Sequence, residues 1–487
     1  MPQIKAEKLT FAYPGSYDNI FENLSLQLDS SWKLGLIGRN GRGKTTLLRL
    51  LQGGMEYSGT LSCPLPTAYF PYPVNAPQRP TAAVLAQLCP DAEPWQIECE
   101  LAELALPAEV LARPFATLSQ GEQTKALLAA LFLQEGRFLL IDEPTNHLDA
   151  AARAQVAAYL KRKQGFILVS HDRRFLDGCV DHILALNRSD VQVQQGNFSS
   201  WYTNFSRQQA FETAQREKLE KQVKQLQQAA ARTEGWSRRV EKGKNSAYDN
   251  GYVGHKAAKM MQRSKNIEHR REQALEEKAQ LLQNTEHVRP LKLIPAAHHA
   301  QRIAEFREVS ICYDGRRINR PLSFTLERGQ RLQISGRNGS GKSSLIRLLL
   351  GEAIAHSGTV SRASQLQISY VPQSAPGLSG SLREFAEKSG VEEALLKSML
   401  RNLGFERLQL EKDLRHFSAG QQKKLLLAKS LCEQAHLYIW DEPLNYIDIY
   451  SRLQLEEVIK EAQPTMIFIE HDAAFCENIA TQSICLD

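Results

Sequence analysis

The sequence predicts an α/β protein in which one module occurs twice, with a long α-helical hairpin between the two copies. Three observations lead to this fold class. Four short motifs recur in the same order and at similar spacings in both halves of the 487-residue chain. In both halves, apolar runs typical of buried strands precede these motifs. Between the halves, about 85 residues show helical periodicity but carry too few apolar side chains for a globular core.

The two copies define the domain organisation. The chain is too long for a single core, so two or three domains are expected. We place the first module at residues 1–204, a basic helical-hairpin linker at 205–300 and the second module at 301–487. The repeated motifs are GLIGRNGRG at 35–43 and QISGRNGSG at 333–341, LSQGEQTK at 118–125 and FSAGQQKK at 417–424, FLLIDEPTNHLD at 138–149 and LYIWDEPLNYID at 437–448, and VSHD at 169–172 and IEHD at 469–472. Four ordered motifs that occur twice indicate a duplicated domain.

The first motif predicts a phosphate-binding loop in each module. Gly38-x4-Gly43-Lys44-Thr45 follows an apolar run and precedes a helical pattern, the context that a P-loop requires. Backbone N–H groups of such a loop bind phosphate oxygens at a helix N-terminus, and the lysine adds a positive charge. The residues expected to bind ATP are Gly38, Asn40, Gly41, Gly43, Lys44, Thr45 and Thr46, with Gly336, Asn338, Gly339, Gly341, Lys342, Ser343 and Ser344 in the second copy.

The third motif places two carboxylates after a buried strand in each module. These are Asp142 and Glu143 in the first copy and Asp441 and Glu442 in the second. In an open parallel sheet, ligands bind at the carboxyl ends of the strands. We expect each aspartate to hold Mg²⁺, and each glutamate to orient and deprotonate the attacking water.

Two histidines and two tyrosines complete the candidate sites. His171 and His471 each follow a β-rich run, and beside a P-loop and an acidic pair they are candidates to contact a γ-phosphate. Tyr13 and Tyr313 precede their P-loops at similar distances and could stack on adenine. An aromatic residue in an early strand is also a common core residue, so this second assignment has a structural alternative.

The linker is predicted to form two antiparallel helices. Leu219, Val223, Leu226 and Ala230 make one apolar stripe, and a thinner seam recurs every seventh residue at Met260, Ile267, Ala274 and Leu281. Each helix would reach about 40 Å. Glycines at 235, 243, 251 and 254 are expected to break the helix and form the tip.

The basic character of the protein belongs to this linker. The whole chain has a formal net charge of +6, whereas residues 206–290 alone carry 18 Lys and Arg against 11 Asp and Glu. Cations with interspersed aromatic residues are typical of surfaces that bind RNA loops and tRNA ends. The expected contacts with RNA are Trp236, Arg238, Arg239, Lys242, Lys244, Tyr248, Tyr252 and His255. A solvated charged loop is the alternative.

These motifs resemble the Walker A, signature, Walker B, D-loop and H-loop sequences of the ATP-binding cassette (ABC) superfamily, over nearly all of the chain outside the linker. Two modules, no apolar stretch of membrane-spanning length and a long charged linker are similar to the ABC-F subfamily in particular. The resemblance implies an ATPase, a monomer whose modules pair head-to-tail over two ATP molecules. The signature residues expected to face ATP are Ser119, Gly121 and Glu122, with Ser418, Gly420 and Gln421 in the second copy.

The two ATP sites are predicted to be unequal. The second module has Gln373 in the position of a Q-loop glutamine, whereas the matching residue of the first module is Tyr72. Leu444 and Tyr446 also replace Thr145 and His147. With the Q-loop included, the expected Mg²⁺ ligands are Thr45, Asp142, Ser343, Gln373 and Asp441.

The resemblance also implies a ribosomal partner. ABC-F proteins bind the E site of the 70S ribosome, on the 50S subunit, and extend the linker toward the P-site tRNA and the peptidyl-transferase centre of 23S rRNA. Three features favour the antibiotic-resistance branch. They are a long basic tip, the lack of an insertion in the first module, and motif sequences similar to those of Lsa/Vga-type proteins. Lincosamides, streptogramin A compounds and pleuromutilins are then the implied drugs.

Three alternatives remain open. One is a drug-independent translation factor of the same fold. Another is the ATPase of a transporter with a separate membrane subunit, which the basic linker disfavours. The third is a DNA-associated ABC-F protein, disfavoured because no coiled coil follows the second module. Eight cysteines without paired or metal-binding spacing and no signal-peptide pattern favour a reduced, cytoplasmic protein without a transmembrane subunit.

Overall fold

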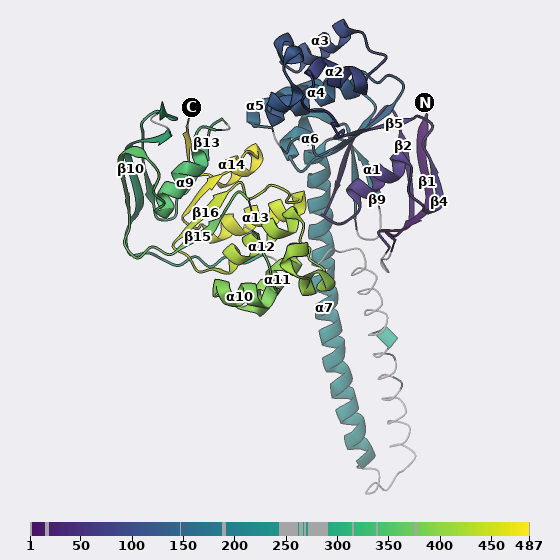
Figure 1. The fold of residues 1–487 in the computed structure, drawn as a ribbon. Helices are drawn as coiled ribbons and strands as arrows, with labels where there is room; N and C mark the ends of the chain where they lie inside the picture. The colour runs from purple at the N-terminus through teal and green to yellow at the C-terminus, as the bar shows by residue number, and fades with distance from the viewer. Residues whose placement is uncertain are drawn as a thin grey trace. The chain divides into compact units, whose positions relative to one another are not determined.

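A computed structural model provides the structure of the chain. It describes residues 2–14, 19–146, 148–187, 191–242, 262, 266, 269–270, 291–313, 316–337, 339–374 and 377–486. The chain divides into two compact units. One comprises Met1–Ser199 together with Arg289–Asp487, and the other is Ser200–Val288. The first unit contains both modules, and Figure 1 shows helices packed around a sheet in each of them.

A mainly parallel sheet forms the centre of the first module. Its strands follow the order β5–β6–β7–β3–β8–β9, and the strands from β5 to β8 are parallel. The central strands are fully buried, which explains why they appear in the sequence as continuous apolar runs. The strands are β3 (Lys33–Gly38), β5 (Thr67–Phe70), β6 (Phe138–Asp142), β7 (Phe166–Val169), β8 (His182–Leu186) and the antiparallel β9 (Val191–Gln195).

The second module repeats this sheet with the order β15–β16–β17–β13–β18, and all four strand pairs are parallel. In both modules the strand before the P-loop pairs with the strand before the histidine motif. That strand in turn pairs with the strand that ends in the acidic motif. All three loops therefore leave the same edge of the sheet. The strands are β13 (Arg331–Ser335), β15 (Ile368–Val371), β16 (Leu437–Asp441), β17 (Met466–Ile469) and β18 (Gln482–Cys485).

Each module also has a smaller antiparallel sheet. In the second module this sheet and the first helix after the P-loop enclose one apolar core with the parallel sheet, and a separate core lies among the later helices. The strands are β1 (Gln3–Phe11), β2 (Phe21–Asp29) and β4 (Ser58–Ser62), and β10 (Arg302–Tyr313), β11 (Arg316–Arg317), β12 (Leu322–Glu327) and β14 (His356–Arg362). The α/β fold with two repeated modules is therefore confirmed.

The helices correspond in pairs between the modules. One helix follows each P-loop, signature, acidic motif and histidine motif, and two further helices lie between the Q-loop and the signature. In the first module they are α1 (Lys44–Gln52), α2 (Thr81–Leu88), α3 (Pro94–Glu103), α4 (Gln120–Phe132), α5 (Ala150–Arg162) and α6 (Arg173–Cys179). In the second they are α9 (Lys342–Leu350), α10 (Leu382–Ser389), α11 (Glu393–Asn402), α12 (Ala419–Cys432), α13 (Ile449–Ala462) and α14 (Ala473–Ile479).

The linker begins as one long helix, α7 (Phe198–Lys242). Its 45 residues correspond to about 70 Å, longer than the sequence predicted. The expected break at Gly235 is wrong, because the helix continues through this residue to Lys242. A single glycine costs a helix only about 1 kcal/mol relative to alanine, and a long helix tolerates that. The second predicted seam, Met260 to Leu281, lies outside the described residues.

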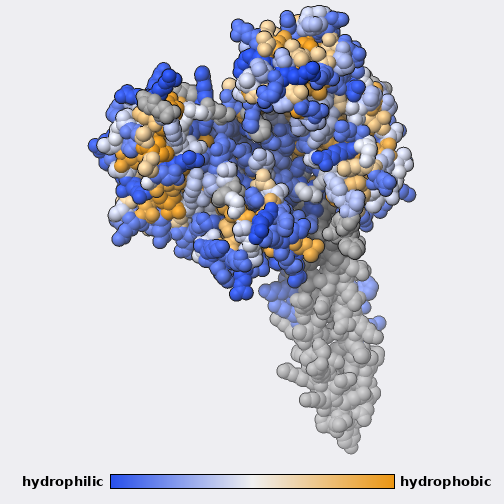
Figure 2. Space-filling view, viewed as in Figure 1, coloured by the Kyte–Doolittle hydropathy of each residue, from blue (hydrophilic) through white to orange (hydrophobic). Residues whose placement is uncertain are grey.

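The face of the molecule drawn in Figure 2 is dominated by hydrophilic residues, with smaller hydrophobic patches between them. No helix in the described part of the chain combines the length and the apolar character needed to cross a lipid bilayer.

Candidate active site

The P-loops have the geometry of a phosphate-binding turn. Gly43, the residue before α1, has φ 84°, a conformation that favours glycine. Lys44 folds back over the loop, and its Nζ donates to the carbonyl oxygens of Gly38 at 2.8 Å and Arg39 at 3.2 Å. Lys342 makes the equivalent contacts in the second module, at 2.7 and 2.9 Å. In both copies the lysine therefore lies at the rim of a loop whose N–H groups open onto a helix N-terminus.

The two predicted adenine-contacting tyrosines lie beside the P-loop helices. The hydroxyl of Tyr13 is 3.0 Å from the Thr46 hydroxyl, and that of Tyr313 is 2.8 Å from the Ser344 hydroxyl. Both rings remain partly exposed. Their hydroxyls thus fix the rings next to the P-loop in both modules.

The hydroxyl after each P-loop lysine meets the aspartate of the acidic motif. Thr45 Oγ1 donates to Asp142 Oδ2 at 2.8 Å, and Tyr69 donates to the same oxygen at 2.9 Å. In the second module Ser343 donates to the carboxylate of Asp441, whose Oδ1 is buried without a hydrogen-bond partner. Hydroxyl and carboxylate oxygens are the ligands that Mg²⁺ prefers. The paired groups, and the unsatisfied oxygen in the second module, fit a magnesium ion.

The two candidate catalytic glutamates have strained backbones. Glu143 has φ 50° and Glu442 has φ 46°. Their N–H groups donate across to the neighbouring strand, to Val169 O at 2.9 Å and Ile469 O at 3.0 Å. Non-glycine residues held in the left-handed region occur preferentially at functional sites. Here the turn aims each glutamate away from the strand end and toward the P-loop edge.

The histidines lie next to these glutamates, but the two pairs differ. His171 Nε2 is 3.2 Å from Glu143 Oε1, whereas His471 Nε2 is 3.9 Å from Glu442 Oε1. Burial raises the pKa of Glu143 to about 8. Burial and the nearby charge of Lys44 lower the pKa of His171 well below its usual value. The carboxylate and the imidazole of the first pair lie closer together than those of the second.

The second P-loop and the first signature together line a cavity, which we call the Lys342 site. Its volume is about 1140 Å³, slightly above the roughly 300–1,000 Å³ typical of small-molecule sites. Among the predicted site residues, those that line it are Tyr313, Gly339, Gly341, Lys342, Ser343, Ser344, Gln373, Glu442 and His471 from the second module, with Ser119, Gly121 and Glu122 from the first. Gly336 begins the same loop, and Asn338 lies outside the described residues.

Each signature serine begins a helix. Ser119 is the N-cap of α4 and Ser418 is the N-cap of α12, and each forms a capping box with the residue three positions later. The box partner is Glu122 in the first module and Gln421 in the second. In the second module, Gly420 between them lies against Tyr446, since a Cβ at this position would be 3.2 Å from Tyr446 O. Helix N-termini of this kind attract anions.

The first P-loop packs directly on the second module, and we call this region the Lys44 site. Asn40 Nδ2 donates to Tyr446 O at 2.7 Å, and the Arg39 guanidinium lies 5.9 Å from the centre of the Tyr450 ring. The residue that matches Tyr450 in the first module is Ala151, which lines the cavity of the Lys342 site. The P-loop of the Lys44 site thus meets a large aromatic side chain where the Lys342 site has an alanine.

The Q-loops also differ in structure. Gln373 lines the cavity of the Lys342 site. The hydroxyl of Tyr72 instead accepts a hydrogen bond from Gln134 Nε2 at 2.8 Å, near the C-terminal end of α4. Tyr72 therefore anchors its loop to the helical part of the first module, away from the P-loop edge.

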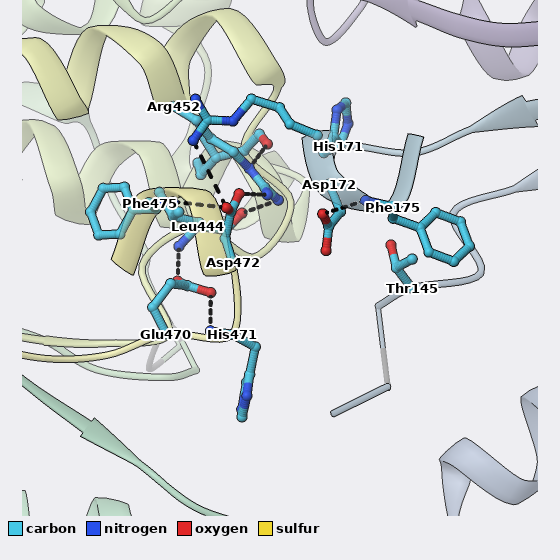
Figure 3. Close-up of polar contacts among 12 residues, drawn as sticks. Thr145, His171, Asp172, Phe175, Leu444, Arg452, Glu470, His471, Asp472 and Phe475 are labelled. Carbon is cyan, nitrogen blue, oxygen red and sulfur yellow. Dashed lines mark hydrogen bonds and ion pairs between the residues drawn. The ribbon is translucent and has the colours of Figure 1, made fainter. Parts of the chain in front are cut away.

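Sequence reasoning missed a buried ion-pair network between the modules. Arg173 on α6 pairs with Glu456 on α13 and lies 3.8 Å from Asp472. Asp472 also accepts from Arg452 at 2.9 Å and from the N–H of Phe475, as Figure 3 shows. The residues that match Arg173 and Glu456 in the repeat are alanines 473 and 157. Charged residues in one module at positions where the other module has alanine were the sequence signal that could have revealed this network.

The predicted RNA contacts of the linker cannot be compared with the described structure. The backbone at Trp236, Arg238, Arg239 and Lys242 is helical within α7, but their side chains are outside the described part. Lys244, Tyr248, Tyr252 and His255 lie entirely outside it. These residues stay predictions.

Comparisons with known proteins agree with the two-module architecture. The family model described as "ABC transporter" matches residues 21–146 and 319–445, together more than half of the chain. The ribosome protection protein VmlR of Bacillus subtilis (strain 168) is 28% identical, covering 98% of this chain and 85% of its own length. The energy-dependent translational throttle protein EttA of Escherichia coli (strain K12) is 26% identical, covering 95% and 88%.

A solved structure shares the fold. It is the complex of the archaeal ribosomal stalk protein aP1 with the archaeal ribosome recycling factor aABCE1, with a TM-score of 0.64 over 95% of this chain and 84% of that chain, at 18% identity. Paired P-loops, signatures and acidic motifs in one chain are the parts of a tandem ATPase. The chain thus belongs to the ABC transporter family of ATP-binding cassette proteins, as an ABC-F-type ATPase with two cassettes.

Proposed function

We propose that the protein binds the ribosome in its ATP-bound form and protects the peptidyl-transferase centre from lincosamides, streptogramin A compounds and pleuromutilins. The linker enters from the E site and extends toward the P-site tRNA. ATP binding closes the two modules into the form that fits the ribosome, and hydrolysis opens them and releases the protein. The nucleotide is thus a conformational switch.

The basic linker between two paired ATPase modules is the observation that carries this proposal. In the described part of α7, the basic residues Arg207, Lys218, Lys221 and Lys224 are all exposed. A long exposed helix with cations on its surface suits the phosphate backbone of RNA. Two relatives that match nearly all of this chain carry names that refer to ribosome protection and to translation.

The proposal assigns each site residue a role in ATP hydrolysis. When bound, Mg²⁺ neutralises charge on the β- and γ-phosphates. The residues that would hold it are Thr45 and Asp142 in the Lys44 site and Ser343, Asp441 and Gln373 in the Lys342 site. In this proposal Glu143 and Glu442 accept a proton from the attacking water, and His171 and His471 contact the γ-phosphate.

A sedimentation experiment tests the ribosomal role. The Glu143→Gln/Glu442→Gln double variant keeps ATP unhydrolysed, so it is expected to co-sediment with 70S ribosomes in ATP and not in ADP. The matched control carries Lys44→Ala and Lys342→Ala in addition, which removes the phosphate contacts, and it is expected to stay in the supernatant. If the double variant stays in the supernatant with ATP, the ribosomal role is wrong.

A drug-independent translation factor is the second candidate. Identity to the translational throttle protein, at 26%, is nearly the same as identity to the ribosome protection protein, at 28%, so the comparison does not separate the two functions. Expression in a susceptible bacterium separates them. Protection predicts a higher inhibitory concentration for the three drug classes, lost when Arg238, Arg239 and Lys242 are replaced by Glu. Unchanged drug tolerance together with ribosome binding would favour the translation factor.

A further inference from the structure

Lys423 is a buried lysine of the second module that the nucleotide-binding motifs do not require. It lies on α12, five residues after Ser418, and 3% of its surface is exposed. Its Nζ donates to three backbone carbonyls: Pro372 at 2.7 Å, Asp441 at 2.9 Å and Gln373 at 3.1 Å. An ammonium group has three N–H donors, so Lys423 is fully paired inside the protein.

These carbonyls belong to two separate parts of the Lys342 site. Pro372 and Gln373 form the loop after β15, and Asp441 is the last residue of β16. Lys423 therefore ties the loop that carries the cavity-lining Gln373 to the strand end that carries Asp441 and Glu442. Charge-assisted hydrogen bonds in a buried position fix such loops more firmly than neutral ones.

The first module provides an internal comparison. The residue that matches Lys423 is Thr124, and its hydroxyl donates to Gln120 O of its own helix at 2.9 Å. This side chain reaches neither the Q-loop nor the acidic motif. The loop that carries Tyr72 is held at the other end of α4, by Gln134. The first module thus lacks both the glutamine and the lysine that would hold it.

A second exchange accompanies the first. The residue before His471 is Glu470, whereas the first module has Ser170 in that position. The buried Glu470 carboxylate accepts from Leu444 N at 3.1 Å and from His471 N at 2.8 Å, so it joins the acidic-motif loop to the histidine loop (Figure 3). The first module has no carboxylate in this position, so this link between the two loops belongs to the second module.

We propose that Lys423 is a positioning residue that holds the Gln373 loop against the end of β16 and so supports ATP hydrolysis at the Lys342 site, with no counterpart at the Lys44 site. It lines the cavity of the Lys342 site and acts through the backbones of Gln373 and Asp441. The inference rests on the ATPase activity of the modules and is independent of the proposed ribosomal role.

Site-specific backgrounds test this role. In a Glu143→Gln background, turnover reports the Lys342 site, and Lys423→Met is expected to lower kcat at least about tenfold, because a loop displaced by about 1 Å loses catalytic alignment. In a Glu442→Gln background, the residual turnover of the Lys44 site is expected to stay within about twofold. No loss in the first background, or equal losses in both, would overturn the proposal.

Hydrogen exchange supplies a readout that does not depend on turnover. In Lys423→Met, amides in residues 368–374 are expected to exchange faster, whereas those in residues 67–74 are unchanged. Uniformly faster exchange would show a general loss of stability and overturn the positioning role. Thr124→Val is the matched control and leaves both segments and the turnover unchanged.

A double-mutant cycle gives a further check. If Lys423 acts through Gln373, adding Lys423→Met to Gln373→Ala lowers turnover by less than about twofold beyond Gln373→Ala alone. Fully additive losses would contradict the proposal. Lys423→Gln is expected to keep more of the turnover than Lys423→Met, since its amide retains two N–H donors for the same carbonyls, and equal losses in the two variants would contradict the proposal.

Discussion

The Lys44 site and the Lys342 site contain the same motifs but differ in what surrounds their carboxylates. At the Lys44 site, the Glu143 carboxylate lies 3.2 Å from His171 Nε2, beside a P-loop that packs against Tyr446 and Tyr450 of the second module. At the Lys342 site, the corresponding pair faces a cavity of about 1140 Å³. Gln373 lines this cavity, and Lys423 holds the loop that carries it.

Because the two sites share their motifs but differ in their surroundings, a motif alone does not define a hydrolytic site. The Lys44 site lacks both a Q-loop glutamine and a lysine in the position of Lys423, so the surroundings of Glu143 are less complete than those of Glu442. A tightly packed P-loop also exchanges its ligand less readily than an open one. We therefore expect the Lys342 site to carry most of the turnover.

The largest difference is expected between the two glutamates. Glu442→Gln is expected to lower steady-state ATP turnover about 100-fold or more, because it removes the general base of the open site. Glu143→Gln is expected to lower turnover less than about threefold, since the Lys44 site carries the smaller share of the turnover. Phosphate release from each purified variant measures both effects, and thermal melting confirms that both are folded. Equal losses in the two variants would contradict unequal sites.

The second prediction compares the two aspartates that begin α5 and α13. Asp448 pairs with the buried Lys424 at 2.6 Å, and this pair holds the pKa of Asp448 well below its usual value. Asp149 has the same capping bond, but the lysine in its module, Lys125, donates to Gln155 instead. Asp448→Asn leaves a buried ammonium without its counter-charge and is expected to cost about 3 kcal/mol of unfolding free energy at pH 7.

The effect of Asp448→Asn on the unfolding free energy is expected to depend on pH. A carboxyl whose pKa is depressed by folding contributes stability that is complete above its unfolded pKa, 3.8, and is lost as the pH falls through the folded value. The difference in unfolding free energy between wild type and Asp448→Asn is therefore constant down to about pH 4 and narrows below it. Asp149→Asn is the control, expected to be nearly neutral because Asn caps helices as well as Asp. A pH-independent difference would exclude the charge pair as its cause.

Much of this architecture could be predicted from the sequence, because the motifs combine local chain conformation with chemistry. A glycine-rich loop before a helix, and two carboxylates after an apolar run, specify where a residue lies on a parallel sheet. Serines that start the signature motif predict helix N-termini by the same local logic. The described structure places Thr45 against Asp142 and lines the cavity with Lys342, Gln373 and Glu442.

The features that sequence reasoning missed depend on partners distant in the chain. Lys423 follows the signature motif on a helix, where a lysine would be expected to be exposed. Its three carbonyl partners come from other parts of the chain, so its burial could not be predicted from the local sequence. Arg173 and Glu456 are 283 residues apart. The prediction that the helix breaks at Gly235 is wrong because a single glycine is a weak helix breaker, and the helical turns on both sides of it decide whether the helix continues.

The third prediction concerns contacts between the modules. Arg173→Ala and Glu456→Ala are each expected to lower the unfolding free energy by about 2 kcal/mol, because each leaves a buried charge without its main partner. Asp472 and Asn478 still contact the remaining charge and limit the loss. The double variant has alanine at both positions, like the matching pair of the repeat. Its loss of unfolding free energy is therefore expected to be smaller than the sum of the two single losses by about 1 kcal/mol or more. Chemical denaturation measures all three. Additive losses would contradict a direct pair.

The smallest effect is expected from giving the first module its missing glutamine. Tyr72→Gln removes the hydrogen bond with Gln134 and is expected to cost about 1 kcal/mol of unfolding free energy. Turnover is expected to change less than about twofold, because no lysine at position 124 holds the new side chain toward the P-loop edge. Assayed in a Glu442→Gln background, where the Lys44 site alone reports, a large gain in turnover from Tyr72→Gln would show that the glutamine is sufficient. A gain that requires Thr124→Lys as well would instead show that the second module depends on the two residues as a unit.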